Sequence, residues 1–163
     1  MSTRLKGKQL VIVGAATGIG KSVATPAVPE GARVVIADLA VDQGQATARQ
    51  IGAEFIRCDV ADEASVRAMV SGSVETMGGL DGLVNNAGLQ RASALDKITV
   101  DYWYSLMAVN PRGVFLATRE AVPHLRAAGG GSIVNTSSLA GKRGGPGIAA
   151  YAASKGAVMA FPT

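Results

Sequence analysis

Five short, mostly apolar runs alternate with segments of helical periodicity, and this alternation limits the possible fold more than any other feature of the chain. The runs span residues 9–13, 33–37, 54–58, 80–84 and 132–135. Their length and apolar character are typical of strands that are covered on both faces. Strands that alternate with helices form parallel sheets with right-handed crossovers. The sequence therefore predicts a single α/β domain, residues 1–163, built on a doubly wound parallel sheet.

Helical segments are expected from about residue 19, at 41–51, at 62–77 with Asp62 as N-cap, at 99–128 and from about 149. Prolines should interrupt two of these segments. Pro26 and Pro29 fall inside the first segment, so that helix should kink or stop near Thr25. Pro111 disfavours a helical conformation at the preceding Asn110. The long segment should therefore bend at Asn110.

Composition excludes several classes of function. The net charge is +4, but the basic residues form no stripe with interleaved aromatics, which are only 4% of the chain, so no nucleic-acid partner is expected. Cys58 is the only cysteine, which rules out an internal disulfide and a cysteine-based metal site, and it is interpreted as a buried apolar residue. Residues 1–8 lack an apolar leader and no long apolar run follows. We expect a cytoplasmic protein with no membrane partner.

Polar or glycine residues follow each predicted strand. They are Gly14, Asp38, Asp59, Asn86 and Ser138. In a parallel sheet the carboxyl ends of the strands share one edge, and ligands bind beyond that edge. The sequence therefore predicts a ligand site that these residues share.

The glycine loop after the first strand has the spacing Gly-x-x-x-Gly-x-Gly, formed by Gly14, Gly18 and Gly20. Backbone without Cβ atoms can approach a pyrophosphate, which the N-terminus of the following helix also attracts. A tight turn without a ligand is the alternative. Gly20 and Lys21 resemble the end of the phosphate-binding loop of nucleoside triphosphatases, but that motif needs glycine where Ala15 stands.

Asp38 ends the second strand, where a carboxylate can accept hydrogen bonds from an adenosine ribose and repel a 2′-phosphate. Its expected neighbours, Thr17 and Leu39, are not basic. These residues favour NAD over NADP. The alternative is a solvated aspartate that caps the next helix.

Tyr151 and Lys155 are four positions apart, so a helix would place them on the same face. An ammonium group favours the ionised form of a nearby phenol, which suits proton transfer to and from a substrate. Chance also produces this spacing, so its meaning depends on the rest of the chain.

Taken together, the motifs resemble those of the short-chain dehydrogenase/reductase family, over essentially the whole chain. In family order they are Gly14-x-x-x-Gly18-Ile19-Gly20, Asp59-Val60, Asn85-Asn86-Ala87-Gly88, Asn110, Ser138 and Tyr151-x-x-x-Lys155. The resemblance implies a Rossmann-like sheet of five strands in the order 3-2-1-4-5. It also implies that the last strands and the substrate lid of the family fold are missing after Thr163, which leaves the domain C-terminally incomplete and the fifth strand as an exposed edge.

The resemblance assigns roles to individual residues. Tyr151 would be the general acid/base, Lys155 would assist it and bind the nicotinamide ribose, and Ser138 would hold the substrate oxygen. Asn110 would position a water that links Lys155 to solvent. The cofactor would contact Gly14, Thr17, Gly18, Ile19, Gly20, Asp38, Leu39, Asp59, Val60, Asn86, Ala87, Gly88, Tyr151 and Lys155.

The implied activity is hydride transfer between NAD and a small-molecule substrate, interconverting a secondary alcohol and a ketone without a metal ion. The alternative is a nucleotide-binding fragment or truncated paralogue without catalysis. Gln90, Leu139 and residues 141–147 would line part of the substrate pocket, and His124 is interpreted as structural. Family members often form homodimers or homotetramers, which is the expected assembly.

Overall fold

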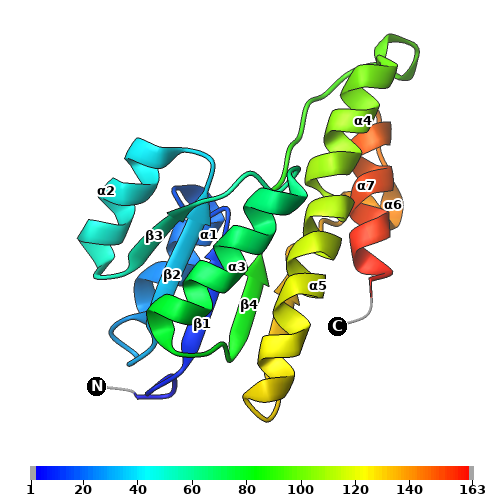
Figure 1. Cartoon of the computed structure of the whole chain (residues 1–163). Coiled ribbons are helices and arrows are strands. Elements are labelled where there is room, and N and C mark those ends of the chain that lie inside the picture. Colours follow the sequence, from blue (N-terminus) through cyan, green and yellow to red (C-terminus); the bar gives the residue numbers. More distant parts are fainter. Residues whose placement is uncertain (1–2, 162–163) are drawn as a thin grey trace.

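The computed structural model describes residues 3–161 and contains one parallel sheet at its centre (Figure 1). Its strands run in the order β3-β2-β1-β4-β5, as predicted. The bounds are β1 (Gln9–Val13), β2 (Arg33–Asp38), β3 (Glu54–Arg57), β4 (Gly82–Asn85) and β5 (Ser132–Asn135). β4 begins two residues later than expected, because Leu80 and Asp81 link it to the turn at Gly78 without joining the strand, although Leu80 is fully buried.

Helices cover both faces of the sheet: α1 (Gly18–Ala27) and α2 (Val41–Ile51) one face, α3 (Glu63–Met77) and α5 (Pro111–Ala127) the other. Alternate residues of the central strands pack on opposite sides. Val11 and Val35 belong to the apolar cluster under α3 and α5, whereas Ile12 and Ile36 belong to the cluster under α1 and α2. The expected cap of α3 is confirmed, since the Asp62 carboxylate accepts a hydrogen bond from Ala64 N.

The prolines act near the positions expected for them. α1 continues through Pro26 and ends at Ala27, two residues beyond the expected stop, and Pro29 lies in the turn that follows. Pro26 lacks the N–H that would donate to the Ser22 carbonyl, so it interrupts the hydrogen-bond ladder and the helix stops one residue later. The predicted bend at Asn110 is a break between α4 (Val100–Val109) and α5, which starts at Pro111. Asn110 itself keeps a right-handed helical backbone (φ −72°, ψ −75°), contrary to expectation.

β3 and β5 are the two edge strands of the sheet. The remaining elements are a single 3₁₀ turn, η1 (Leu95–Lys97), the short helix α6 (Ala140–Arg143) and α7 (Ala149–Met159). α6 and α7 lie on the same side of the molecule as α4 (Figure 1). The start of the glycine-rich segment 141–147 is thus helical and not a loop as expected, because the Leu139 carbonyl accepts hydrogen bonds from the amides of Lys142 and Arg143. α7 packs against α4, α5 and α6.

Within residues 3–161, no helix is both long enough and apolar enough to cross a membrane.

Candidate functional site

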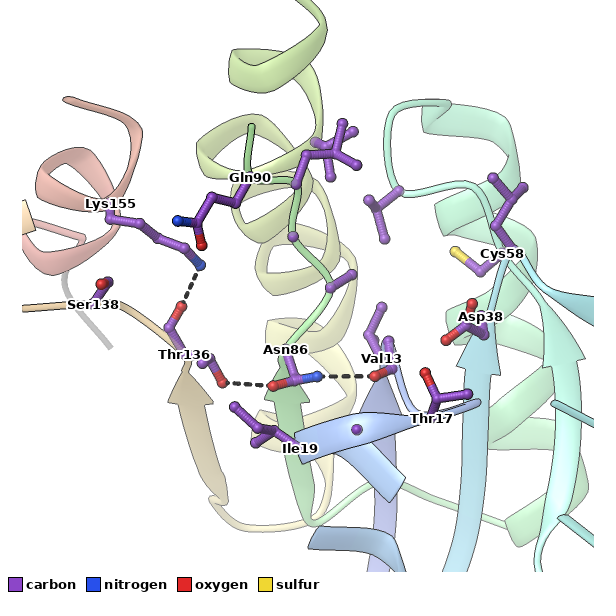
Figure 2. Close-up of a pocket in the computed structure, with 18 of the residues that line it drawn as sticks. Val13, Thr17, Ile19, Asp38, Cys58, Asn86, Gln90, Thr136, Ser138 and Lys155 are labelled. Carbon is purple, nitrogen blue, oxygen red and sulfur yellow. Dashed lines mark hydrogen bonds between the residues drawn. The ribbon is translucent and has the colours of Figure 1, made fainter. Parts of the chain in front are cut away.

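A cleft of about 650 Å³ opens at the carboxyl ends of the strands (Figure 2). Residues that follow all five strands line it, together with Tyr151 and Lys155 from α7. The structure brings every residue predicted for catalysis or cofactor binding to this cleft except Gly20 and Asn110. Leu139 and residues 141–147, which were expected around a substrate, do not line it either. The polar strand ends therefore meet at one site, as the parallel topology requires.

The three glycines of the loop have different tasks. Gly14 has a left-handed backbone (φ +77°), and a Cβ atom there would lie 2.5 Å from Ala87 N. A Cβ atom on Gly20 would overlap the Gly14 carbonyl oxygen. Gly18 is also left-handed (φ +58°), but the space beside it is open and it lines the cleft. Gly14 and Gly20 allow close packing, whereas Gly18 exposes backbone at the start of α1, where anions are stabilised.

Asp38 lies at one end of the cleft beside Thr17 and Leu39. Its Oδ2 accepts a hydrogen bond from Ala16 N at 2.9 Å, and its Oδ1 accepts one from Ala40 N at 3.0 Å. Each carboxylate oxygen retains a lone pair for another donor. The carboxylate therefore holds the entry to α2 and can still accept hydrogen bonds from a ligand.

Next to it, Cys58, Asp59 and Val60 form the wall from the third strand end. The Asp59 Oδ1 accepts a hydrogen bond from Ala61 N at 2.9 Å. Cys58 is 2% exposed, as expected of a buried apolar residue, and burial raises the pKa of its thiol to about 11. The neutral thiol is neither a nucleophile nor a metal ligand at neutral pH. In the described part of the chain, no three His, Cys, Asp or Glu side chains gather as a metal site would need.

Lys155 and Tyr151 share the inner face of α7 at the other end of the cleft. The Lys155 ammonium lies 5.9 Å from the centroid of the Tyr151 ring and donates a hydrogen bond to the Thr136 carbonyl at 2.7 Å. The side chain is 5% exposed, and this burial lowers the pKa of Lys155.

The two serines that follow β5 differ in what their hydroxyls contact. Ser137 Oγ donates to the Lys155 carbonyl at 2.9 Å and so supports α7. Ser138 Oγ accepts from Ala140 N at 3.2 Å, which leaves its hydroxyl proton for another acceptor. Of the two, Ser138 is therefore the hydroxyl that can donate to a substrate oxygen.

Asn110 is fully buried behind Gly88 and does not line the cleft. Its Oδ1 accepts from Leu89 N at 2.8 Å, and its Nδ2 donates to Leu89 O at 3.1 Å and to Ser154 Oγ at 2.8 Å. The asparagine thus joins the break between α4 and α5 to the loop after β4 and to α7. A Cβ atom on Gly88 would lie 3.3 Å from Asn110 Oδ1 and 3.4 Å from Lys155 Nζ, so Gly88 separates the two side chains.

Sequence reasoning did not single out several residues that line the cleft. They are Val13, Cys58, Leu89, Val109, Thr136 and Ser137. The signal for Thr136 and Ser137 was present, because they stand between the strand end and Ser138. Of the residues expected around a substrate, Gln90 lines the cleft and points toward the Lys155 end (Figure 2). His124 lies in the last turn of α5 and is not among the lining residues.

Comparisons with known proteins find similar chains. The family model of short chain dehydrogenases matches residues 8–163. The "NADP-dependent (R)-specific alcohol dehydrogenase" of Lentilactobacillus kefiri is 39% identical over 97% of this chain and 65% of its own length. The "Trans-4-hydroxycyclohexanecarboxylate dehydrogenase" of Sinomonas cyclohexanicum is 43% identical over 98% of this chain and 65% of its own.

A solved structure has the same fold. The crystal structure of a short chain dehydrogenase from Mycobacterium smegmatis superposes with a TM-score of 0.93 at 38% sequence identity, covering 97% of this chain and 69% of that one. The chain spans about 65% of the length of the two curated relatives named above.

Proposed function

The chain belongs to the short-chain dehydrogenase/reductase family, and on this premise we propose that it is an NAD-dependent oxidoreductase that interconverts a secondary alcohol and a ketone. The observation that carries the proposal is one continuous cleft with the glycine loop and Asp38 at one end and Ser138, Tyr151 and Lys155 at the other. A site for nucleotide binding and a site for proton transfer are thus joined. The relatives named above are dehydrogenases of alcohols or a hydroxy acid by their names.

The residues present fit a dinucleotide. Gly18 has open space where a side chain would stand, beside the first turn of α1, so its backbone would hold the pyrophosphate. Asp38 would accept hydrogen bonds from the adenosine ribose, and Val60 would contact the adenine. Among residues 3–161 the Lys155 ammonium has one hydrogen-bond acceptor, the Thr136 carbonyl, and two of its three protons would remain for the nicotinamide ribose. When bound, NAD supplies the hydride acceptor at its nicotinamide ring.

The proton chemistry falls to three side chains. Ser138 would donate its free hydroxyl proton to the substrate oxygen and fix its position. Tyr151 would take the proton from an alcohol, or return it to a ketone oxygen. The buried Lys155 ammonium, 5.9 Å from the Tyr151 ring, would stabilise the negative charge that develops on the Tyr151 oxygen during proton transfer.

Asp38 should set the preference for NAD. Two like charges about 5 Å apart repel by about 3 kcal/mol at an effective dielectric constant of about 20, and a 2′-phosphate would lie beside this carboxylate. Lys155 is the basic residue among those that line the cleft, and it lies at the opposite end from Asp38 (Figure 2). The preference needs its own measurement, since the relative from Lentilactobacillus kefiri is named NADP-dependent.

We expect NADH to bind at least about tenfold more tightly than NADPH, and Asp38→Ala to reduce this ratio, as measured by cofactor fluorescence. Asp42→Ala is the matched control, because Asp42 is an exposed carboxylate in the first turn of α2 and does not line the cleft. Equal affinities for the two cofactors in the unmodified protein would exclude a discriminating role for Asp38.

The activity itself is tested by measuring NADH formation from NAD with a panel of secondary alcohols, with Tyr151→Phe assayed in parallel as the control. We expect turnover that Tyr151→Phe reduces at least about a hundredfold while NADH binding is kept. Binding of NADH without turnover of any alcohol would favour the alternative, a nucleotide-binding module. Absence of NADH binding would refute both.

A further inference from the structure

A line of hydrogen bonds joins the glycine loop to Lys155 across the ends of three strands (Figure 2). Asn86 Nδ2 donates to the Gly14 carbonyl at 2.8 Å. Thr136 Oγ1 donates to Asn86 Oδ1 at 3.3 Å, and the Thr136 carbonyl accepts from Lys155 Nζ at 2.7 Å. Two side chains that are distant in sequence thus connect the two ends of the cleft.

Backbone hydrogen bonds hold both intermediate residues. Thr136 N donates to Asn85 O at 2.9 Å, which continues the pairing of β5 with β4 by one residue. Asn86 N donates to Val13 O at 3.0 Å, which does the same between β4 and β1. The side chains of Thr136 and Asn86 therefore leave from fixed positions, and their hydrogen bond fixes the orientation of the peptide that presents its carbonyl to Lys155.

Lys155 depends on that carbonyl. Its ammonium is buried, and burying a charge without a polar partner is costly. Within residues 3–161, the Thr136 carbonyl is the hydrogen-bond acceptor that its Nζ contacts. Ser137 holds the Lys155 backbone, not the ammonium. A change in the direction of the Thr136 carbonyl would therefore move the ammonium relative to Tyr151.

We propose that Thr136 is a positioning residue: its carbonyl sets the place of the Lys155 ammonium, and its hydroxyl, through Asn86, makes that place depend on the glycine loop. The catalytic meaning of this link rests on the proposed function. A ligand that settles against the loop at Gly14 would stabilise the same arrangement that holds Lys155 beside Tyr151. Cofactor binding and proton transfer would then share one hydrogen-bonded support.

The experiment measures the solvent-exchange rate of the Lys155 ammonium protons by ¹H–¹⁵N NMR on protein labelled with ¹⁵N-lysine. Thr136→Val keeps the carbonyl and the branched side chain but removes the hydroxyl donor. We expect exchange to accelerate about fivefold in this variant, as for the loss of one hydrogen bond of ordinary net strength. Thr136→Ser keeps the hydroxyl and should remain within about twofold of the unmodified protein.

Asn86→Ala removes the acceptor from the other side and should reproduce the acceleration. The double variant should exchange no faster than the faster single variant, because both remove the same link. Unchanged exchange in Thr136→Val or in Asn86→Ala, or acceleration in Thr136→Ser, would overturn the proposal. If circular dichroism shows that Thr136→Val does not fold, the exchange rates of Asn86→Ala and Thr136→Ser test the proposal in its place.

NADH binding to the unmodified protein is measured in parallel. Its absence would refute the proposed function and leave the exchange comparison intact. If the protein binds NADH but the Lys155 exchange rate is the same in Thr136→Val as in the unmodified protein, this inference alone is refuted.

Discussion

The two left-handed glycines of the loop offer a sharp test of how the site is built. Gly14 and Gly18 both have positive φ, at +77° and +58°, but only Gly14 has backbone atoms where a Cβ would stand. Gly14→Ala and Gly18→Ala therefore introduce the same methyl group and similar backbone strain. They differ in whether that methyl group collides with the Ala87 backbone.

The expected costs follow from these two contributions. Left-handed backbone strain is about 1–2 kcal/mol for a residue with a Cβ atom, and it applies to both variants. The Gly14 methyl would also lie 2.5 Å from Ala87 N and 2.6 Å from Ala87 Cα, which are backbone atoms at a strand end. Overpacking of this kind adds about 1–3 kcal/mol. Gly14→Ala should lose about 2–5 kcal/mol and Gly18→Ala about 1–2 kcal/mol.

The assay is urea unfolding followed by circular dichroism, with the free energy of unfolding compared at equal m-values. Fluorescence titration with NADH should show the reverse order, because the Gly18 methyl points into open space at the cleft whereas the Gly14 methyl does not. Equal destabilisation by the two substitutions, or a larger loss for Gly18→Ala, would refute the reasoning.

Two further predictions concern the serines and the cysteine. Ser138→Ala should lower kcat/KM about a hundredfold or more in steady-state kinetics, with NADH binding kept. Ser137→Ala should mainly lower the free energy of unfolding, by about 1 kcal/mol in urea unfolding. Burial raises the pKa of the Cys58 thiol to about 11, so the folded state holds this proton more tightly than the unfolded chain. The stabilisation from this bound proton is complete below the thiol pKa of the unfolded chain and is lost as pH rises through the folded pKa. Between about pH 9 and 11, the free energy of unfolding should therefore fall by up to about 2.7 kcal/mol more in the unmodified protein than in Cys58→Ala, as measured by urea unfolding. Equal losses in the two proteins would contradict burial of the thiol.

The fold was predictable where a local pattern decides it. The alternation of short apolar runs and helical segments gave the parallel sheet, and Pro111 gave the break at Asn110. Element ends were less predictable, because tertiary contacts override local preference. α1 includes Pro26 and ends one residue after it, and Leu80 is fully buried although it lies outside the strand.

The site was predictable in its strand-end residues and less so in their connections. Asp38, Asn86 and Ser138 meet because the carboxyl ends of parallel strands share an edge. The position of Thr136 at the strand end was visible in the sequence, but its hydrogen bonds were not, because its carbonyl and its hydroxyl face different partners. Asn110 was placed by a motif, but its contacts with Leu89 and Ser154 appear only in three dimensions.

The most direct test of the central claim is the fate of the carbinol hydrogen. The protein is given NAD and a secondary alcohol deuterated at the carbinol carbon, and the reduced cofactor is examined by mass spectrometry. We expect NADH that carries one deuterium from the alcohol, and far less of it from Tyr151→Phe. Reduced cofactor without deuterium, or NAD that stays oxidised with every alcohol offered, would contradict it.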